Sequence, residues 1–264
     1  MKKPRETNLS IKDIARRARV STATVSRVIN QSPLVVRRTR ERVLGVIRRS
    51  GFTPNLSAQS LIKGRTHMLA MLVPPEAGFF SAYYFRRLLY GITEALAGRG
   101  YRLMICQPEG YDPRTGYSVG SNGLQADGLF VVAPLAHDRL VGHLEARRTP
   151  SVLINSRSRT LDWVDLDNLG AAMLVTQKLA GLGHRKIGYI GGVSRSVNAA
   201  ARLRGYRRGL EASGLSYDPG RVFRGDYTAE SGYEAARKMV SRPGRPTALF
   251  AANDLMAMGA VRAA

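Results

Sequence analysis

The apolar positions of the first 50 residues recur three or four residues apart, the spacing of an amphipathic helix, in three short segments. These series are Ile11, Ile14, Ala15 and Ala18; Val25, Val28 and Ile29; and Val43, Leu44, Val46 and Ile47. Ser10 is placed to cap the first helix with Asp13 in its first turn, and Ser21 or Thr22 is placed to cap the second. The third helix is expected over residues 38–49. Two short helices separated by about three residues and braced by a third predict a helix-turn-helix module.

The outward face of the second predicted helix carries small polar side chains and one arginine. Thr22, Ala23 and Ser26 would let the helix lie deep in a DNA major groove. Arg27 can donate two hydrogen bonds to guanine O6 and N7. Contacts to backbone phosphates, which position a protein without reading sequence, are expected from Arg37, Arg38 and Arg40. The alternative interpretation is a three-helix bundle with a solvated basic face.

The distribution of charge favours a polyanionic partner. The chain carries a net charge of +22, and residues 1–65 hold 16 Lys and Arg against three acids. Basic charge concentrated at one end indicates binding to nucleic acid or to an anionic membrane. Because these helices lack the broad Trp, Phe and Leu face of interfacial helices, nucleic acid is the better interpretation.

Residues 51–65 predict a hinge. Pro54 ends the preceding helix, Asn55 can cap the next one, and the segment "LSAQSL" gives barely two turns, which are marginal alone. Leu56 and Leu61 would be exposed there, unless the helix folds against DNA and wedges a leucine between base steps in the minor groove. The expected DNA contacts of this segment are Asn55, Ala58 and Leu61. A plain linker is the alternative.

From residue 66 onward, short apolar runs alternate with helical stretches. The expected strands are 67–73, 101–106, 128–132, 151–155, 186–192 and 247–252, and the expected helices include 85–98, 170–182, 200–212 and 229–240. This alternation predicts an α/β fold with open parallel sheets, whose ligands bind beyond the carboxyl ends of the strands. A polar ligand such as a sugar or a nucleobase would suit the residues found there, which are Phe79, Phe80, Asn155, Asn198, Arg202 and Asn253. Asp254 fits a helix N-cap equally well, and Phe80 fits a core position.

The N-terminal part resembles the lactose/galactose-repressor family of bacterial transcription regulators in three ordered stretches: "IKDIARRARVSTATVSRVIN", "TRERV" and "GFTPNLSAQSL". Later stretches are similar to that family's periplasmic-binding-protein-like domain of two hinged subdomains: "ADGLFVV", "VDLDNLGAAMLV", "GHRKIGYIGG", "ARLRGYRRGL" and "LFAANDLMAMGAVRA". The resemblance implies a homodimer on a near-palindromic operator, with an effector that shifts the subdomains and hence the paired hinge helices. It also implies base reading by Thr22, Ala23 and Arg27, a minor-groove role for Leu61, and effector contacts by Arg202 and Asn253.

Two stretches depart from the family pattern. Residues 108–128 hold five glycines where relatives carry a helix, and the sequence stops at Ala264, before the strands that complete the second subdomain in relatives. The expected organisation is a helix-turn-helix domain over 1–50, a hinge helix and linker over 51–65, and a periplasmic-binding-protein-like domain over 66–264 that is truncated at its C-terminus. We therefore expect either a truncated product or a regulator that has lost effector control, alongside the intact-regulator interpretation.

Enzymatic and cofactor-dependent functions gain little support. The segment "GYSVG" (116–120) fits the G-x-S-x-G nucleophile elbow around Ser118, and Asp165 and His184 follow in hydrolase order, but turn residues flank it on both sides. The sequence lacks a G-x-x-x-x-G-K-[ST] phosphate loop and "GYIGGVSR" lacks G-x-G-x-x-G, so no nucleotide cofactor is expected. The single cysteine and the spacing of the four histidines give no metal-ligand pattern.

The expected cellular location helps to distinguish a DNA-binding regulator from a solute-binding protein. The sequence opens without an apolar signal segment and has no apolar run approaching ~20 residues, which predicts a cytoplasmic protein without a membrane partner. A cytoplasmic solute-binding protein would leave residues 1–65 unexplained. The sequence therefore predicts a DNA-binding transcriptional regulator, a repressor by default, that responds to a small polar effector.

Overall fold

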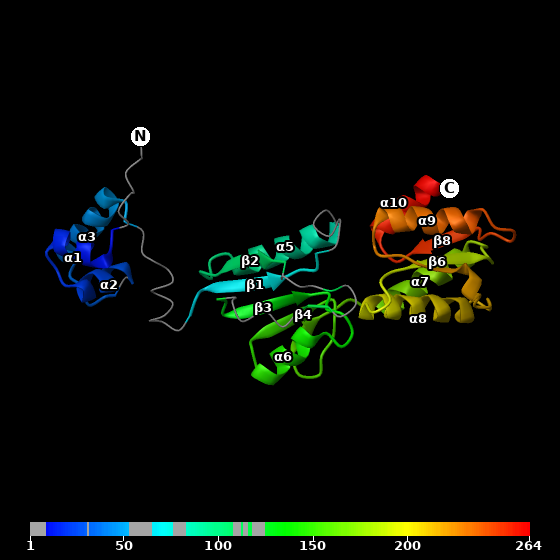
Figure 1. The fold of residues 1–264 in the computed structure, drawn as a ribbon, viewed down its shortest axis with the longest axis horizontal. Coiled ribbons are helices and arrows are strands. Elements are labelled where there is room, and N and C mark those ends of the chain that lie inside the picture. Colours follow the sequence, from blue (N-terminus) through cyan, green and yellow to red (C-terminus); the bar gives the residue numbers. More distant parts are fainter. Residues whose placement is uncertain are drawn as a thin grey trace. The chain divides into compact units, whose positions relative to one another are not determined.

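The computed structural model describes residues 9–30, 32–52, 65–75, 83–107, 112, 116–117 and 125–264. The chain divides into two compact units, Met1–Thr66 and His67–Ala264, which are drawn in Figure 1 and are treated separately below.

Unit 1 consists of three helices, α1 (Ile11–Ala18), α2 (Thr22–Ile29) and α3 (Arg37–Ser50). The first helix begins with the predicted Ser10 cap: the Ser10 hydroxyl accepts from the Asp13 backbone N–H, and the Asp13 carboxylate accepts from the Ser10 backbone N–H. These hydrogen bonds from Ser10 lower the pKa of Asp13. The left-handed conformation of Arg19 (φ 51°) then ends α1 and starts the turn into α2.

The predicted inward positions form the core of unit 1. Ile14, Val25 and Val43, one from each helix, have no exposed surface, and they share one cluster with Ala15, Ala18, Val28 and Val46. Val35, which is buried in this cluster, and Val20, which is partly buried against it, come from the segments between helices, where no helical spacing predicts them. The short connections thus contribute to the core that holds α2 in place.

The first sheet of unit 2 has five parallel strands in the order β2-β1-β3-β4-β5. They are β1 (Met68–Leu72), β2 (Arg102–Cys106), β3 (Gly128–Val132), β4 (Ser151–Ile154) and β5 (Asp162–Val164). Helices α5 (Tyr83–Leu96) and α6 (Arg139–Arg147) cover opposite faces of this sheet (Figure 1). Alternation along β1 explains this arrangement, because Leu72 packs with Leu140 of α6, whereas Met71 packs with Phe85 of α5.

The second sheet has three parallel strands in the order β7-β6-β8. They are β6 (Ile187–Gly191), β7 (Val222–Arg224) and β8 (Ala248–Ala251), and the 3₁₀ helix η2 (Pro219–Arg221) precedes β7. Helices α7 and α8 lie on one side of it, and α9 and α10 on the other (Figure 1). Their bounds are α7 (Asn168–Gly181), α8 (Val197–Ala212), α9 (Ala229–Val240) and α10 (Asp254–Ala263).

The fold class predicted from the sequence is confirmed: an all-helical unit precedes an α/β unit with parallel sheets. One detail is wrong: Asn253, rather than Asp254, is the N-cap of α10, and its side chain accepts from the Met256 N–H. Strands β5 and β7 and helix α6 lie outside the predicted elements. Most of the glycine-rich stretch 108–128 lies outside the described residues. No described helix is long and apolar enough to cross a membrane.

Candidate functional site

The exposed face of α2 is the first candidate site. Thr22, Ala23 and Arg27 are exposed and Ser26 is half-buried, while Val25 and Val28 of the same helix are buried. The Ser21 hydroxyl fixes the start of this helix by accepting from the Thr24 backbone N–H at 3.1 Å. The three predicted base-reading residues, Thr22, Ala23 and Arg27, therefore lie on the side of the helix turned away from the core.

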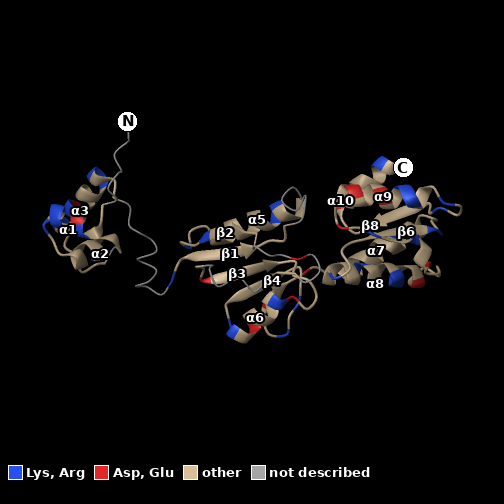
Figure 2. Cartoon of the chain, in the orientation of Figure 1, with Lys and Arg blue, Asp and Glu red and all other residues tan. Residues whose placement is uncertain are grey.

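The basic side chains of unit 1 differ in how they are held. Figure 2 shows Lys and Arg gathered on α1 and α3. Arg37 forms an exposed ion pair with Glu41 (2.8 Å), and Arg38 is exposed. Arg40 instead donates to the Ser32 carbonyl at 2.5 Å, which ties α3 to the segment that precedes it. A phosphate contact by Arg40 remains a prediction, and this residue already has a structural role. The hinge residues Asn55, Ala58 and Leu61 lie outside the described residues.

The second candidate site lies where the strands of unit 2 end. Arg202, on α8, donates from Nε to the Asn168 side chain (2.8 Å) and from Nη1 to the Ala252 carbonyl (2.6 Å). Ala252 directly follows β8, and Asn168 begins α7. The Arg202 side chain is thus fixed by two contacts from different elements, as a preorganised ligand-binding group requires.

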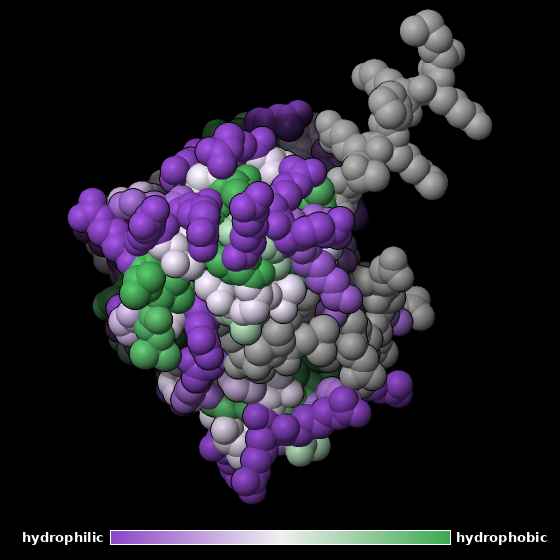
Figure 3. Space-filling model, turned by 90° about the vertical axis from the view of Figure 1, so that its left-hand side faces the viewer, coloured by the Kyte–Doolittle hydropathy of each residue, from purple (hydrophilic) through white to green (hydrophobic). Residues whose placement is uncertain are grey.

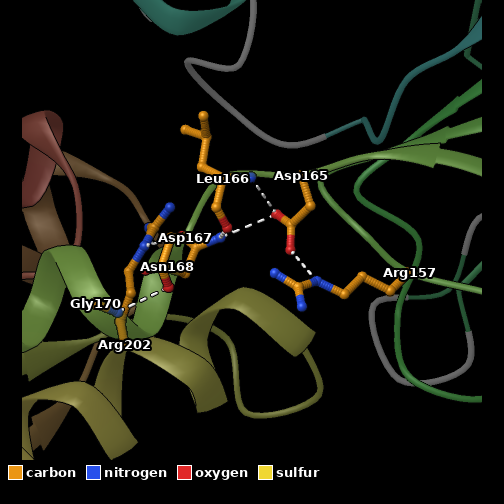
Figure 4. Close-up of polar contacts among 7 residues, drawn as sticks. All are labelled: Arg157, Asp165, Leu166, Asp167, Asn168, Gly170 and Arg202. Atoms are coloured by element: carbon orange, nitrogen blue, oxygen red, sulfur yellow. Dashed lines mark hydrogen bonds and ion pairs between the residues drawn. The ribbon is translucent and has the colours of Figure 1, made fainter.

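A buried carboxylate extends this arrangement to the first sheet (Figure 4). Asp165, whose side chain is 5% exposed, follows β5 and accepts from the Asn168 amide at 3.0 Å. Its other oxygen pairs with Arg157 at 3.0 Å, and the Arg157 guanidinium lies 5.1 Å above the Trp163 ring. Polar contacts therefore run from Arg157 through Asp165 and Asn168 to Arg202.

Asn155 lies at the same edge. It follows β4 in the left-handed conformation (φ 57°), and its side chain hydrogen-bonds to Tyr84 at the start of α5. Burial raises the pKa of Tyr84 to about 12, with Asp165 and Arg202 close enough to act on it electrostatically. Two of the predicted ligand residues, Asn155 and Arg202, thus lie around one tyrosine.

The remaining predicted ligand residues are Asn253, Asn198, Phe79 and Phe80, and they do not share one environment. Asn253 donates to the Tyr227 carbonyl at 2.9 Å while capping α10, so its amide is part of the local structure next to Ala252. Asn198 is 7% exposed in the first turn of α8. Phe79 and Phe80 lie outside the described residues.

Comparison with known proteins shows which family carries both of these sites. Residues 10–55 match the bacterial regulatory proteins of the lacI family, and residues 66–264 match the periplasmic binding proteins and sugar binding domain of the LacI family. The chain belongs to the lacI family of bacterial regulatory proteins. It is 32% identical over 261 residues to catabolite control protein A of Priestia megaterium, an alignment that covers 97% of this chain and 77% of the relative.

Two solved structures of LacI-family proteins support this assignment. The transcriptional regulator CelR in complex with cellobiose is 32% identical, with a TM-score of 0.65, and the match covers 97% of this chain and 77% of that one. The lac repressor dimer bound to operator and the anti-inducer ONPF is 26% identical, with a TM-score of 0.83 and the same coverage.

This LacI-family chain is a DNA-binding transcriptional regulator and not an enzyme. Two residues of the hydrolase-like constellation have structural partners of their own. Asp165 is bonded to Arg157 and Asn168, and His184 Nδ1 lies 2.9 Å from the Thr247 hydroxyl. Ser118 lies outside the described residues. Among the described side chains, no group of three His, Cys, Asp or Glu residues could hold a metal ion.

Sequence reasoning missed Tyr84, Asp165 and Asn168 as members of the second site. Asp165 and Asn168 follow a strand of only three exposed residues, which has no apolar run to reveal it. Tyr84 lies in the first turn of a helix whose pattern indicates only packing. Asp165 and Asn168 do share the stretch "VDLDN", whose polar residues just before a helix were the available signal.

Proposed function

We propose that this protein is a cytoplasmic repressor that binds a near-palindromic operator as a homodimer and changes its affinity when a small polar effector occupies the crevice of unit 2. The observation that carries the proposal is the exposed α2 face, with Arg27 on a helix anchored by buried Val25 and Val28. A rigid helix with small outer side chains can enter the major groove, where base edges are distinguishable.

The DNA contacts follow from chemistry and position. Thr22, Ala23, Ser26 and Arg27 face the base edges, with Arg27 paired to a guanine. Backbone phosphates are bound by Arg37, Arg38 and Arg40, with Arg40 also holding Ser32. We assign residues 1–50 to the DNA-binding domain, 51–65 to the hinge and 66–264 to effector binding. In the hinge, the DNA contacts are Asn55, Ala58 and Leu61.

The effector is a sugar or a nucleobase-like compound. Arg202 is its principal anchor, since the bonds to Asn168 and Ala252 use only part of its donor set and hold the guanidinium in place. The relative CelR has been solved with cellobiose, which supports a polyhydroxylated ligand for this class of crevice. The supporting contacts are assigned to Phe79, Phe80, Asn155, Asn198 and Asn253.

Operator binding with and without candidate effectors tests this proposal. The protein is titrated into a fluorescently labelled, two-fold-symmetric duplex, and sugars and nucleobases are added one at a time. We expect one compound to change the wild-type affinity by about 5- to 150-fold, the usual range of allosteric coupling. Arg202→Ala should bind the duplex normally and lose this response.

Lys238→Ala, on an exposed position of α9, is the control and should respond like the wild type. If the Arg202→Ala variant responds as strongly as the wild type, the assignment of the effector site is wrong.

A further inference from the structure

Two large apolar side chains are exposed in the segment between α2 and α3. Leu34 is 79% exposed and Val36 is 71% exposed, whereas Val35 between them is buried in the core of unit 1. The chain turns at Leu34 and bends at Val35, so that Val35 is buried while both of its neighbours are exposed. Neither Leu34 nor Val36 belongs to the core cluster of unit 1.

Val36 also occupies a position at which the fold would favour a different residue. It is the N-cap of α3, and no side chain among the described residues caps that helix. A Ser, Thr, Asp or Asn there would accept a hydrogen bond from an unpaired helix N–H and stabilise the helix. Since a valine forgoes this cap and is exposed, the stability of unit 1 does not account for it.

Both residues line a groove of about 340 Å³ together with Arg27 and Arg42. The lining also includes Ser21 of the α2 cap, and its described residues include no acidic one. Apolar side chains that reach the surface among charged ones are visible in Figure 3. The groove therefore shares Arg27 with the α2 face, and its charge is complementary to a polyanion.

We propose that Leu34, with Val36 beside it, reads a thymine of the operator by packing against its 5-methyl group. This inference rests on the proposed DNA-binding function. The methyl group of thymine is the apolar feature that base edges present in the major groove. In the same groove, Arg42 suits a flanking phosphate and Arg27 the edge of a neighbouring guanine, whereas a protein partner would have to supply acids to match these two arginines.

Replacing single thymines by deoxyuridine removes only the methyl group and tests the contact directly. In a duplex that the protein binds specifically, each thymine of one half-site is replaced in turn, and Kd is measured for wild type and Leu34→Ala. We expect one position at which the wild type binds about three- to fivefold more weakly, which corresponds to ~0.8 kcal/mol for one buried methyl-sized group. Leu34→Ala should bind both duplexes equally, because the two changes remove the same contact.

Leu174→Ala is the matched control, because Leu174 is 67% exposed on α7 of unit 2. It should keep the wild-type response to deoxyuridine. Far-UV circular dichroism of Leu34→Ala checks that the helices are retained, as expected for a residue that contributes little to the core. Val36→Ser restores a helix cap and removes apolar surface, so it should also weaken the methyl response without loss of stability.

The possible results distinguish a failure of the thymine contact from a failure of the proposed DNA-binding function. Specific binding in which the deoxyuridine profile of Leu34→Ala equals that of the wild type overturns the inference and leaves the proposed function intact. A change in self-association of Leu34→Ala, with an unchanged profile, also overturns it and assigns the groove to a protein partner. Failure of the wild type to prefer any sequence overturns the inference together with the proposed function.

Discussion

Arg27 and Arg38 are both exposed arginines of unit 1, yet they should affect DNA binding differently. Arg27 is proposed to bind a base edge, so we expect Arg27→Ala to lose ~1–3 kcal/mol on the preferred site and to relax specificity at one base position. Arg38 is proposed to bind a phosphate, so Arg38→Ala should weaken binding to all sequences about equally and reduce the slope of log K against log salt by about 1.

Binding isotherms at several salt concentrations, on the preferred site and on single-base variants, distinguish the two roles. Arg237→Ala, which removes an exposed ion pair with Glu234 in unit 2, is the control and should change neither quantity. Equal effects of the Arg27 and Arg38 variants on every sequence would contradict the division of roles.

Two buried tyrosines of the second sheet provide a matched test of hydrogen bonding. Tyr189 and Tyr206 are each 1% exposed, and their rings stack with centroids 5.0 Å apart. The Tyr206 hydroxyl donates to the Ile187 carbonyl at 2.8 Å, whereas the Tyr189 hydroxyl has no hydrogen-bond partner among the described residues.

Tyr206→Phe should therefore lower the free energy of unfolding by ~0.5–1.5 kcal/mol, because the Ile187 carbonyl loses its donor. Tyr189→Phe should leave it unchanged or raise it by about 1 kcal/mol, because an unpaired buried hydroxyl is removed. Urea denaturation of both variants measures the difference. A larger loss for Tyr189→Phe than for Tyr206→Phe would show that the Tyr189 hydroxyl has a partner after all.

At the scale of elements, the close approach of α7 and α8 depends on glycine. A Cβ atom at Gly205 of α8 would overlap the Leu169 carbonyl of α7 and lie 2.8 Å from the Ala172 Cβ. Backbone atoms cannot rotate out of the way as a flexible side chain can. Gly205→Ala should therefore destabilise the protein by ~1–3 kcal/mol.

Gly142→Ala, in the middle of α6, has nothing within 4 Å of the added Cβ atom. There the helix propensity of alanine should stabilise by up to about 1 kcal/mol. Thermal unfolding of the two variants should thus show shifts of opposite sign. A stabilised Gly205→Ala variant would contradict the tight α7–α8 contact.

The bounds of an element were predicted well where several of its apolar residues face the core. Helix α3 lies within one residue of the predicted range because four apolar residues define its face. Strand β5 was not predicted, since its three residues are all exposed and carry no pattern. The position of Val35 depends on the packing of three helices, which local sequence does not encode.

The two candidate sites also differ in how far local sequence predicts them. The outer face of α2 follows from helical spacing alone, so Thr22, Ala23 and Arg27 could be identified from the sequence. The surroundings of Arg202 depend on contacts between residues 34 and 50 positions apart in the chain. The edge rule for parallel sheets predicted that Arg202 lies beyond the strand ends, where it contacts the Ala252 carbonyl after β8, but the rule could not identify Asn168 as its partner.

For the whole molecule, basic charge is concentrated in the part of the chain that we propose binds DNA. Residues 1–65 carry 16 Lys and Arg against three acids, and the second unit carries Arg202 with its hydrogen bonds to Asn168 and Ala252. In the proposed function, coupling between operator and effector binding passes through residues 51–65, the proposed hinge. An effector can shift operator affinity only by the difference in its own affinity for the two states of the protein.

The proposed function depends first on sequence reading by the α2 face, and selection of binding sites from a randomised duplex library at near-physiological salt tests that role. We expect enrichment of a two-fold-symmetric site with a guanine in each half, and loss of that guanine from the consensus of Arg27→Ala. DNA retention without enrichment, disappearing as salt rises, would show that α2 does not read sequence, because phosphate contacts alone give that result.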